Sequence, residues 1–224
     1  MVCWTRPLGA AFLIACLWIV PATAQPRPML AARLAALAES SSPYPLASWD
    51  SALERIEADR IRVEDCRAAG PCRDILAKPM ADLVARFSGL EGQRRLLAVN
   101  RHFNAFPYIP DRAGERPSDD WASPLTFLQR SGDCEDYAIA KYLALRLLGV
   151  AEEDMAILIL RDSARQLDHA VLVVEEGGAP MVLDNLRGLA PLEAYSDFQP
   201  LFVLTSEASW RLKSHAPQRL AEAR

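Results

Sequence analysis

The spacing of apolar residues changes after Gly149, and this change constrains the fold more than any other feature of the chain. Upstream, apolar residues recur at helical intervals with charged residues between them, which predicts amphipathic helices. The segments with this pattern are 30–39, 48–64, 75–88 and 90–103. Downstream, short aliphatic or β-branched runs bounded by turn residues predict strands at 155–160, 169–174, 181–184 and 201–205. We therefore predict an α+β protein in which a helical first half precedes an antiparallel sheet.

The segment that joins these two halves predicts a loop and two further helices. Residues 106–123 carry several prolines, too many breaking residues for a regular element, so we expect a long surface loop there. Ser123 followed by proline is a typical N-cap and first helical position, which predicts a short helix over 124–130. A second helix over 134–148 ends at Gly149, a typical C-terminal cap. We expect this helix to pack one apolar stripe against the sheet.

Length and composition limit the organisation and the possible partners. A chain of 224 residues with 51% hydrophobic content can bury one core, which two lobes can share. We predict a signal peptide over 1–24, a helical N-terminal lobe over 25–104, and a second lobe over 105–224 that holds the 134–148 helix and the sheet. The net charge of −4 offers no basic surface, so nucleic acid is not an expected partner.

The N-terminal segment has the features of a cleavable signal peptide. Arg6 precedes an apolar run over 8–20, and the small residues Ala22 and Ala24 suit a cleavage site. A competing interpretation is a lipoprotein that is cleaved before Cys16 and acylated there. That cleavage would leave apolar residues instead of a polar tether at the mature N-terminus. We therefore favour an exported protein without a lipid anchor.

Cysteine content leaves one thiol without an evident partner. Loss of the signal peptide would leave Cys66, Cys72 and Cys134, and three thiols cannot all pair with one another. Cys66 and Cys72 flank the turn-prone segment 67–71, so an oxidising compartment would allow a disulfide between them. Both also suit small, buried apolar positions, and the sequence leaves this choice open. In either case Cys134 stays free.

Cys134 occupies a position at which a thiol can become reactive. At the start of a helix, unpaired backbone N–H groups and the positive end of the helix dipole stabilise a thiolate. The same N–H groups can hold the oxyanion that forms when the sulfur attacks a carbonyl group. Cys134 is therefore the candidate nucleophile.

The candidate base and its orienting acid come from a predicted hairpin. His169 opens one strand, Asp184 closes the next, and the connection contains Gly177 and Gly178. A turn centred on 176–177 pairs His169 directly with Asp184, whereas a turn centred on the two glycines shifts the register by two residues. Both registers make the imidazole and the carboxylate neighbours, which predicts a Cys–His–Asp triad. The alternative is that both residues have only structural roles at the ends of strands.

Three acidic residues, Asp133, Glu135 and Asp136, flank the candidate nucleophile. Their negative charge opposes formation of a thiolate, unless another charge offsets it. A hard divalent cation would do so, and calcium suits an exported protein. The simpler interpretation, from the residues alone, is that Asp133 caps the helix while Glu135 and Asp136 interact favourably with its positive N-terminal end.

Two stretches around Cys134, WASPLTFL over 121–128 and GDCEDYAIAKY over 132–142, resemble the bacterial transglutaminase-like cysteine proteinases, whose best-known members are the LapG proteases. The resemblance continues through HAVL at 169–172 and VLDNL at 182–186. It implies a papain-like or transglutaminase-like fold and makes 105–224 the catalytic lobe. The roles that it implies are nucleophile for Cys134, base for His169, orienting acid for Asp184, and calcium association for Asp133, Glu135 and Asp136.

The resemblance also implies a biological role. It implies a periplasmic, calcium-dependent endopeptidase that cleaves large surface adhesins near their N-terminus and so controls biofilm attachment and dispersal. An inner-membrane receptor for cyclic di-GMP would sequester the enzyme. A transglutaminase or amidase with the same triad is the alternative enzyme, and a binding module without catalysis is the alternative from another class. The first half of the chain matches no motif, and Trp121 is expected to pack in the core instead of serving the oxyanion site.

Overall fold

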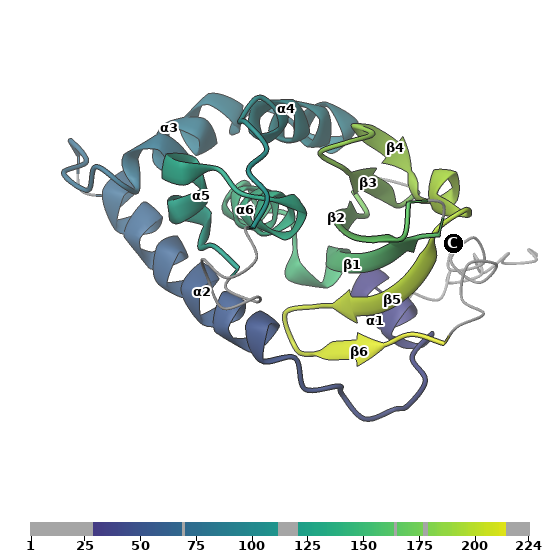
Figure 1. The fold of residues 1–224 in the computed structure, drawn as a ribbon. Coiled ribbons are helices and arrows are strands. Elements are labelled where there is room, and N and C mark those ends of the chain that lie inside the picture. Colours follow the sequence, from purple (N-terminus) through teal and green to yellow (C-terminus); the bar gives the residue numbers. More distant parts are fainter. Residues whose placement is uncertain (1–28, 69, 112–120, 164, 177–178, 214–224) are drawn as a thin grey trace, which may run out of the picture.

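The fold places a layer of helices on one face of a six-stranded antiparallel sheet (Figure 1). The computed structural model describes residues 29–68, 70–111, 121–163, 165–176 and 179–213. The predicted signal peptide lies outside these ranges. Among the described residues, no helix has the length and apolar character needed to cross a membrane.

Every helix expected from the apolar spacing is present. The helices are α1 (Leu30–Ala35), α2 (Ala47–Ala68), α3 (Lys78–Phe87), α4 (Gly92–Asn104), α5 (Pro124–Arg130) and α6 (Cys134–Leu147), with 3-10 turns η1 (Glu152–Asp154) and η2 (Leu192–Tyr195). At α5 the predicted cap is confirmed, because the Ser123 hydroxyl accepts a hydrogen bond from Thr126 N at 3.3 Å. At the end of α6, Gly149 adopts a φ of 91°, which favours glycine.

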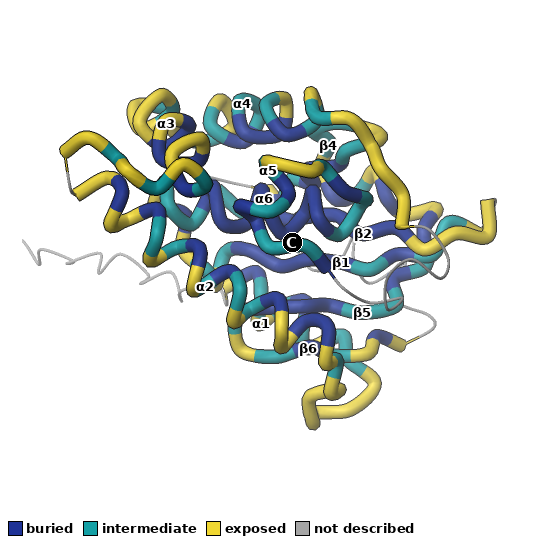
Figure 2. The backbone as a smooth tube through the Cα atoms, turned by 60° about the vertical axis from the view of Figure 1, so that its left-hand side comes forward, coloured by how far each residue is buried: buried dark blue, intermediate teal, exposed yellow. Residues whose placement is uncertain are grey.

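Helix α6 is buried on all sides, which corrects the single apolar stripe predicted for it. All residues from 136 to 145 are buried. The reason is that α2, α3, α4 and α5 surround α6 on one side and β2 covers the other, as the end-on view in Figure 1 shows. Figure 2 shows the same contrast, with α6 and the central strands buried while the outer faces of α2, α3 and α4 are exposed. The start of α6 is therefore held rigidly between helices and sheet.

The sheet contains the four predicted strands and two shorter ones. Its order is β4-β3-β2-β1-β5-β6. The strands are β1 (Met155–Asp162), β2 (Leu167–Val174), β3 (Met181–Leu183), β4 (Leu189–Pro191), β5 (Gln199–Leu204) and β6 (Ser209–Arg211). The sequence analysis missed β4 and β6, because three residues are too few to show an alternating pattern.

Both faces of the central strands are covered, which explains why these strands are continuously aliphatic. On β2, Leu172 and Val174 belong to the core beneath the helices, whereas Val171 and Val173 belong to a second core with α1 and η2. Side chains alternate between the two faces of a strand, so burial of both faces removes the polar positions.

The strand pairing of β2 and β3 follows the second of the two predicted registers. Leu172 lies opposite Leu183 and Val174 lies opposite Met181. This register is shifted by two residues from the one that would pair His169 directly with Asp184. Asp184 follows β3 and is a diagonal neighbour of His169 on the same face, a separation that side chains can bridge.

Cys66 and Cys72 form a disulfide, which resolves the alternative that the sequence left open. The bond ties the end of α2 to the segment that precedes α3. Cys134 is the free cysteine among the described residues.

Candidate active site

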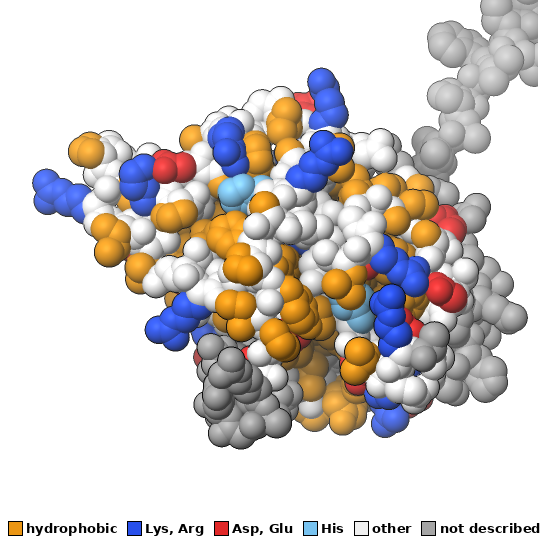
Figure 3. Space-filling view, turned by 45° about the horizontal axis from the view of Figure 1, so that its top comes forward, with side chains coloured by type: hydrophobic (Ala, Val, Ile, Leu, Met, Phe, Trp, Pro, Cys, Tyr) orange, Lys and Arg blue, Asp and Glu red, His pale blue; other side chains and the backbone are white. Residues whose placement is uncertain are grey.

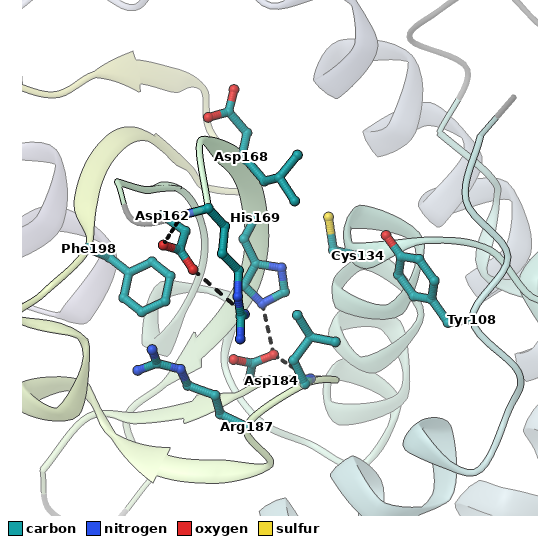
Figure 4. Close-up of a pocket in the computed structure, with 11 residues that line it drawn as sticks. Tyr108, Cys134, Asp162, Asp168, His169, Asp184, Arg187 and Phe198 are labelled. Carbon is teal, nitrogen blue, oxygen red and sulfur yellow. Dashed lines mark hydrogen bonds and ion pairs between the residues drawn. The ribbon is translucent and has the colours of Figure 1, made fainter. Parts of the chain in front are cut away.

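One pocket contains all three residues of the predicted triad (Figure 4). Cys134 begins α6, His169 lies near the start of β2, and Asp184 directly follows β3. Figure 4 shows the imidazole of His169 between the carboxylate of Asp184 and the side of the pocket that carries the thiol. Helix and hairpin thus bring together three residues that are far apart in the sequence.

His169 and Asp184 form a buried pair. His169 Nε2 lies 2.9 Å from Asp184 Oδ1, and the two residues are 8% and 1% exposed. Because Nε2 is engaged by the carboxylate, Nδ1 is the ring nitrogen left for a proton from another group. This is the geometry expected of a base and its orienting acid.

Further hydrogen bonds hold Asp184 in its ionised form. Leu186 N donates to Oδ1 and the Tyr195 hydroxyl donates to Oδ2, both at 2.7 Å. The side chain of Asn104 donates to the backbone oxygen of Asp184, also at 2.7 Å. Burial alone would raise the pKa of Asp184, but the hydrogen bonds from His169, Tyr195 and Leu186 outweigh it and lower the pKa. Tyr195 and Asn104 reach the site only through the tertiary fold, and no motif in the sequence marks them.

The thiol of Cys134 is held in its neutral form by its surroundings. Burial raises its pKa, and the negative charges of Glu135 and Asp133 raise it further. The sulfur lies 3.2 Å from Glu135 Oε2, and the thiol donates a hydrogen bond to that carboxylate. An activated thiolate therefore requires a positive charge near these acids.

The structure brings Asp111, Asp133 and Glu135 together, with one oxygen of each within 4.8 Å of the others. The capping interpretation fails for Asp133, because its side chain makes no capping hydrogen bond to α6. Its Oδ2 instead accepts from Asp111 N at 3.3 Å, while its Oδ1 is buried and has no hydrogen-bond partner among the described residues. Asp111 lies within the segment 106–123, where the sequence analysis identified no metal ligand.

Asp136 lies outside this acidic group, although the sequence analysis placed it with Asp133 and Glu135. Its Oδ1 accepts a hydrogen bond from Ala122 N at 2.6 Å and so anchors the segment before α5. A Cβ atom at Gly132 would lie 2.0 Å from Asp136 Oδ2, so this contact requires glycine. Burial and neighbouring carboxylates raise the pKa of Asp136 to about 7 and that of Glu135 to about 8.

Trp121 packs in the core, as expected. It is 9% exposed, and its ring centroid lies 6.3 Å from that of Trp49. It is not among the residues that line the pocket.

Exposed apolar side chains surround the mouth of the pocket. Tyr108, Leu167 and Leu186 line it and are 50%, 63% and 62% exposed. Figure 3 shows this hollowed face with apolar side chains on both sides of the depression and arginines or lysines on one side. Such a surface suits an extended polypeptide that passes over Cys134.

The model of the family described as bacterial transglutaminase-like cysteine proteinase, BTLCP, matches residues 80–201. The chain belongs to this family. It is therefore a cysteine protease, and the match includes Cys134, His169 and Asp184 but not α1, α2 or the disulfide.

Solved structures of Legionella pneumophila LapG share the fold. One is 23% identical, with a TM-score of 0.55 over 75% of this chain and 97% of LapG. A calcium-bound LapG is 24% identical, with a TM-score of 0.54 over the same shares. An EGTA-treated LapG is 25% identical, with a TM-score of 0.55 over 70% of this chain and 86% of LapG. A search of curated proteins found no significant match. The predicted family and papain-like or transglutaminase-like fold are confirmed.

Lys141 is a buried charge close to the triad. It lies two turns after Cys134 on the same face of α6 and is 0% exposed. Its Nζ lies 3.5 Å from Leu183 O, next to Asp184, and 5.6 Å from the ring centroid of Tyr137. Burial lowers the pKa of Lys141 to about 7, and the negative charge of Asp184 only partly opposes this effect.

Lys141→Met is expected to weaken the rise of the free energy of unfolding with pH above neutrality. The pKa of a lysine in the unfolded chain is about 10.4, so between pH 7 and pH 10 the unfolded protein binds a proton that the folded protein has lost. The stability of the wild type therefore rises with pH in this window, by about 1 kcal/mol per pH unit more than that of Lys141→Met. Urea unfolding at pH 7 and pH 9 measures this difference. Lys78→Met, at a position where the side chain is 54% exposed, is the matched control. Equal pH slopes for wild type and Lys141→Met would refute the expectation.

Proposed function

We propose that this protease is a calcium-dependent periplasmic endopeptidase that cleaves a large surface adhesin near its N-terminus and thereby controls biofilm attachment and dispersal. Its catalytic residues would be Cys134, His169 and Asp184. The observation that carries the proposal is the pocket in which the His169–Asp184 pair lies beside the free thiol at the start of α6.

The chemistry follows from this arrangement. Nδ1 of His169 accepts the proton of Cys134 while Asp184 holds Nε2, and the sulfur then attacks the carbonyl carbon of the scissile peptide bond. Backbone N–H groups at the start of α6 stabilise the oxyanion. The imidazolium returns its proton to the leaving amine, and a thioester to Cys134 remains. Water, deprotonated by His169, hydrolyses the thioester and regenerates the thiol.

The acidic group beside Cys134 fits a calcium ion. Asp111, Asp133 and Glu135 offer hard carboxylate oxygens, and within the part of the chain that the structure describes the buried Oδ1 of Asp133 has no hydrogen-bond partner. A bound calcium ion would supply positive charge that neutralises the carboxylates around the thiol. The existence of LapG in calcium-bound and EGTA-treated forms supports the same dependence here. Asp111 replaces Asp136 in the ligand set that the sequence suggested.

Features of the N-terminal segment and kinship support the proposed location and partner. The signal-peptide pattern over 1–24 supports export, and the disulfide between Cys66 and Cys72 is suited to an oxidising compartment such as the periplasm. An inner-membrane receptor for cyclic di-GMP would sequester the protease and so set the time of cleavage.

Cells that carry either the wild type or Cys134→Ala test the proposal. We expect the wild type to shorten one large surface protein near its N-terminus and to release it into the medium, whereas Cys134→Ala leaves it full-length and attached. Mass spectrometry of surface and released proteins measures both. The variant Cys66→Ala/Cys72→Ala is the control, because it removes two cysteines away from the pocket and should retain cleavage. Identical surface proteins with wild type and Cys134→Ala would contradict the proposal.

A further inference from the structure

The two oxygens of the Asp184 carboxylate have separate partners. Oδ1 accepts from His169 Nε2 at 2.9 Å and from Leu186 N at 2.7 Å. Oδ2 accepts a hydrogen bond from the Tyr195 hydroxyl at 2.7 Å, and among the described residues this hydroxyl is its donor. Asp184 is 1% exposed and Tyr195 is 0% exposed. Bulk water therefore has no access with which to replace the tyrosine if its hydroxyl is lost.

Tyr195 approaches the Asp184 carboxylate from the second core, on the face of the sheet that α1 covers. It ends η2 and belongs to the cluster that α1 forms on the other face of the sheet. Its ring centroid lies 5.5 Å from that of Phe198, and the guanidinium of Arg187 lies over both rings, at 5.5 Å and 4.4 Å from the centroids. Figure 4 shows Arg187 and Phe198 on the same side of the pocket as Asp184. The packing fixes the position from which the hydroxyl donates.

Without a second anchor, a carboxylate can rotate about its Cβ–Cγ bond, because this torsion has broad minima. Hydrogen bonds to Oδ1 alone leave that rotation poorly restrained. The hydrogen bond from Tyr195 to Oδ2 opposes this rotation, because turning the carboxylate would move Oδ2 away from the hydroxyl and break the bond. A fixed carboxylate in turn fixes the imidazole ring, whose Nδ1 then faces Cys134.

We propose that Tyr195 is a positioning residue of this protease, which locks the Asp184 carboxylate through Oδ2 so that Oδ1 orients His169 toward Cys134. The inference rests on the proposed function, since it assigns Tyr195 to the triad named there. Tyr195 touches neither the substrate nor the reacting sulfur and acts entirely through Asp184.

The rate at which iodoacetamide alkylates Cys134 in calcium-containing buffer tests this inference without a protein substrate. Tyr195→Phe removes the hydroxyl and retains the ring, and we expect alkylation about tenfold slower than in the wild type. His169→Ala should be slower still. Tyr44→Phe is the matched control, because Tyr44 is exposed and packs on Phe202 away from the pocket. Its rate should equal that of the wild type.

A spectroscopic signal separates positioning from a general loss of structure. The Nε2 proton of His169 should give a slowly exchanging NMR signal in the wild type and in Tyr44→Phe, and this signal should weaken in Tyr195→Phe although the protein stays folded by circular dichroism. Incorporation of p-aminophenylalanine at position 195, which restores an N–H donor, should recover both the signal and the rate.

The outcomes distinguish this inference from the proposed function. If Tyr195→Phe reacts as fast as the wild type while His169→Ala is slow, the positioning role is refuted and the triad stands. If His169→Ala also reacts as fast as the wild type, the proposed triad fails, and the role of Tyr195 fails with it. If p-aminophenylalanine does not restore the rate, the hydrogen bond to Oδ2 is not the cause and the inference is overturned.

Discussion

Purified Cys134→Ala is expected to have no detectable protease activity on the proposed surface-protein substrate, and His169→Ala is expected to lose about a thousandfold in kcat. The first change removes the atom that forms the thioester, and among the described residues the other two cysteines are bonded to each other. The second change removes the base, while the thiol keeps its hydrogen bond to Glu135 Oε2.

Time courses of cleavage, followed by gel electrophoresis, measure both losses. The Cys66→Ala/Cys72→Ala variant should cleave at a rate close to that of the wild type. The disulfide that it lacks joins the end of α2 to the segment before α3, and neither cysteine lines the pocket. Cleavage by Cys134→Ala at the wild-type rate would mean that another residue is the nucleophile.

Removal of calcium is expected to stop cleavage completely. With no cation, burial and the negative charges of Glu135 and Asp133 keep the thiol of Cys134 protonated, and the three clustered carboxylates repel one another. EGTA should therefore abolish activity, and an excess of calcium should restore it. Asp111→Asn removes the charge of one proposed ligand, so the variant should require about tenfold more calcium for half-maximal activity.

A calcium titration of the cleavage rate measures this requirement. Asp82→Asn is the matched control, because Asp82 is an exposed acid on α3 that pairs with Lys78 outside the pocket. Its calcium dependence should equal that of the wild type. Full activity in EGTA would exclude the metal site, and an unchanged titration for Asp111→Asn would exclude Asp111 as a ligand.

The sequence predicts most helices and the central strands because their periodicity is local. It could not predict that α6 is buried all round, since this depends on how four other helices pack against it. It missed β4 and β6 because their three residues carry no periodic pattern. The sequence analysis left two possible registers for the β2–β3 pairing, and the strands adopt the one that does not pair His169 directly with Asp184.

The candidate site was predictable where a motif or a hairpin brings residues together. Cys134 follows from its position at a helix start, and the proximity of His169 and Asp184 follows from either hairpin register. Asp111 and Tyr195 were not predictable, because a loop and a short 3-10 turn carry them into the site from distant parts of the chain. The role of Asp136 also depends on tertiary packing. Its carboxylate accepts a hydrogen bond from Ala122 N and does not belong to the acidic group of Asp111, Asp133 and Glu135.

Stoichiometric alkylation of Cys134 tests the central claim most directly. The wild-type protein is treated with iodoacetamide for increasing times, and peptide mapping gives the fraction of Cys134 that is labelled. Cleavage of the proposed surface-protein substrate gives the remaining activity. We predict that activity falls in direct proportion to labelling and reaches zero when Cys134 is fully modified, because an alkylated sulfur cannot form a thioester. Persistent cleavage by protein whose Cys134 is fully labelled would contradict the assignment of Cys134 as the nucleophile.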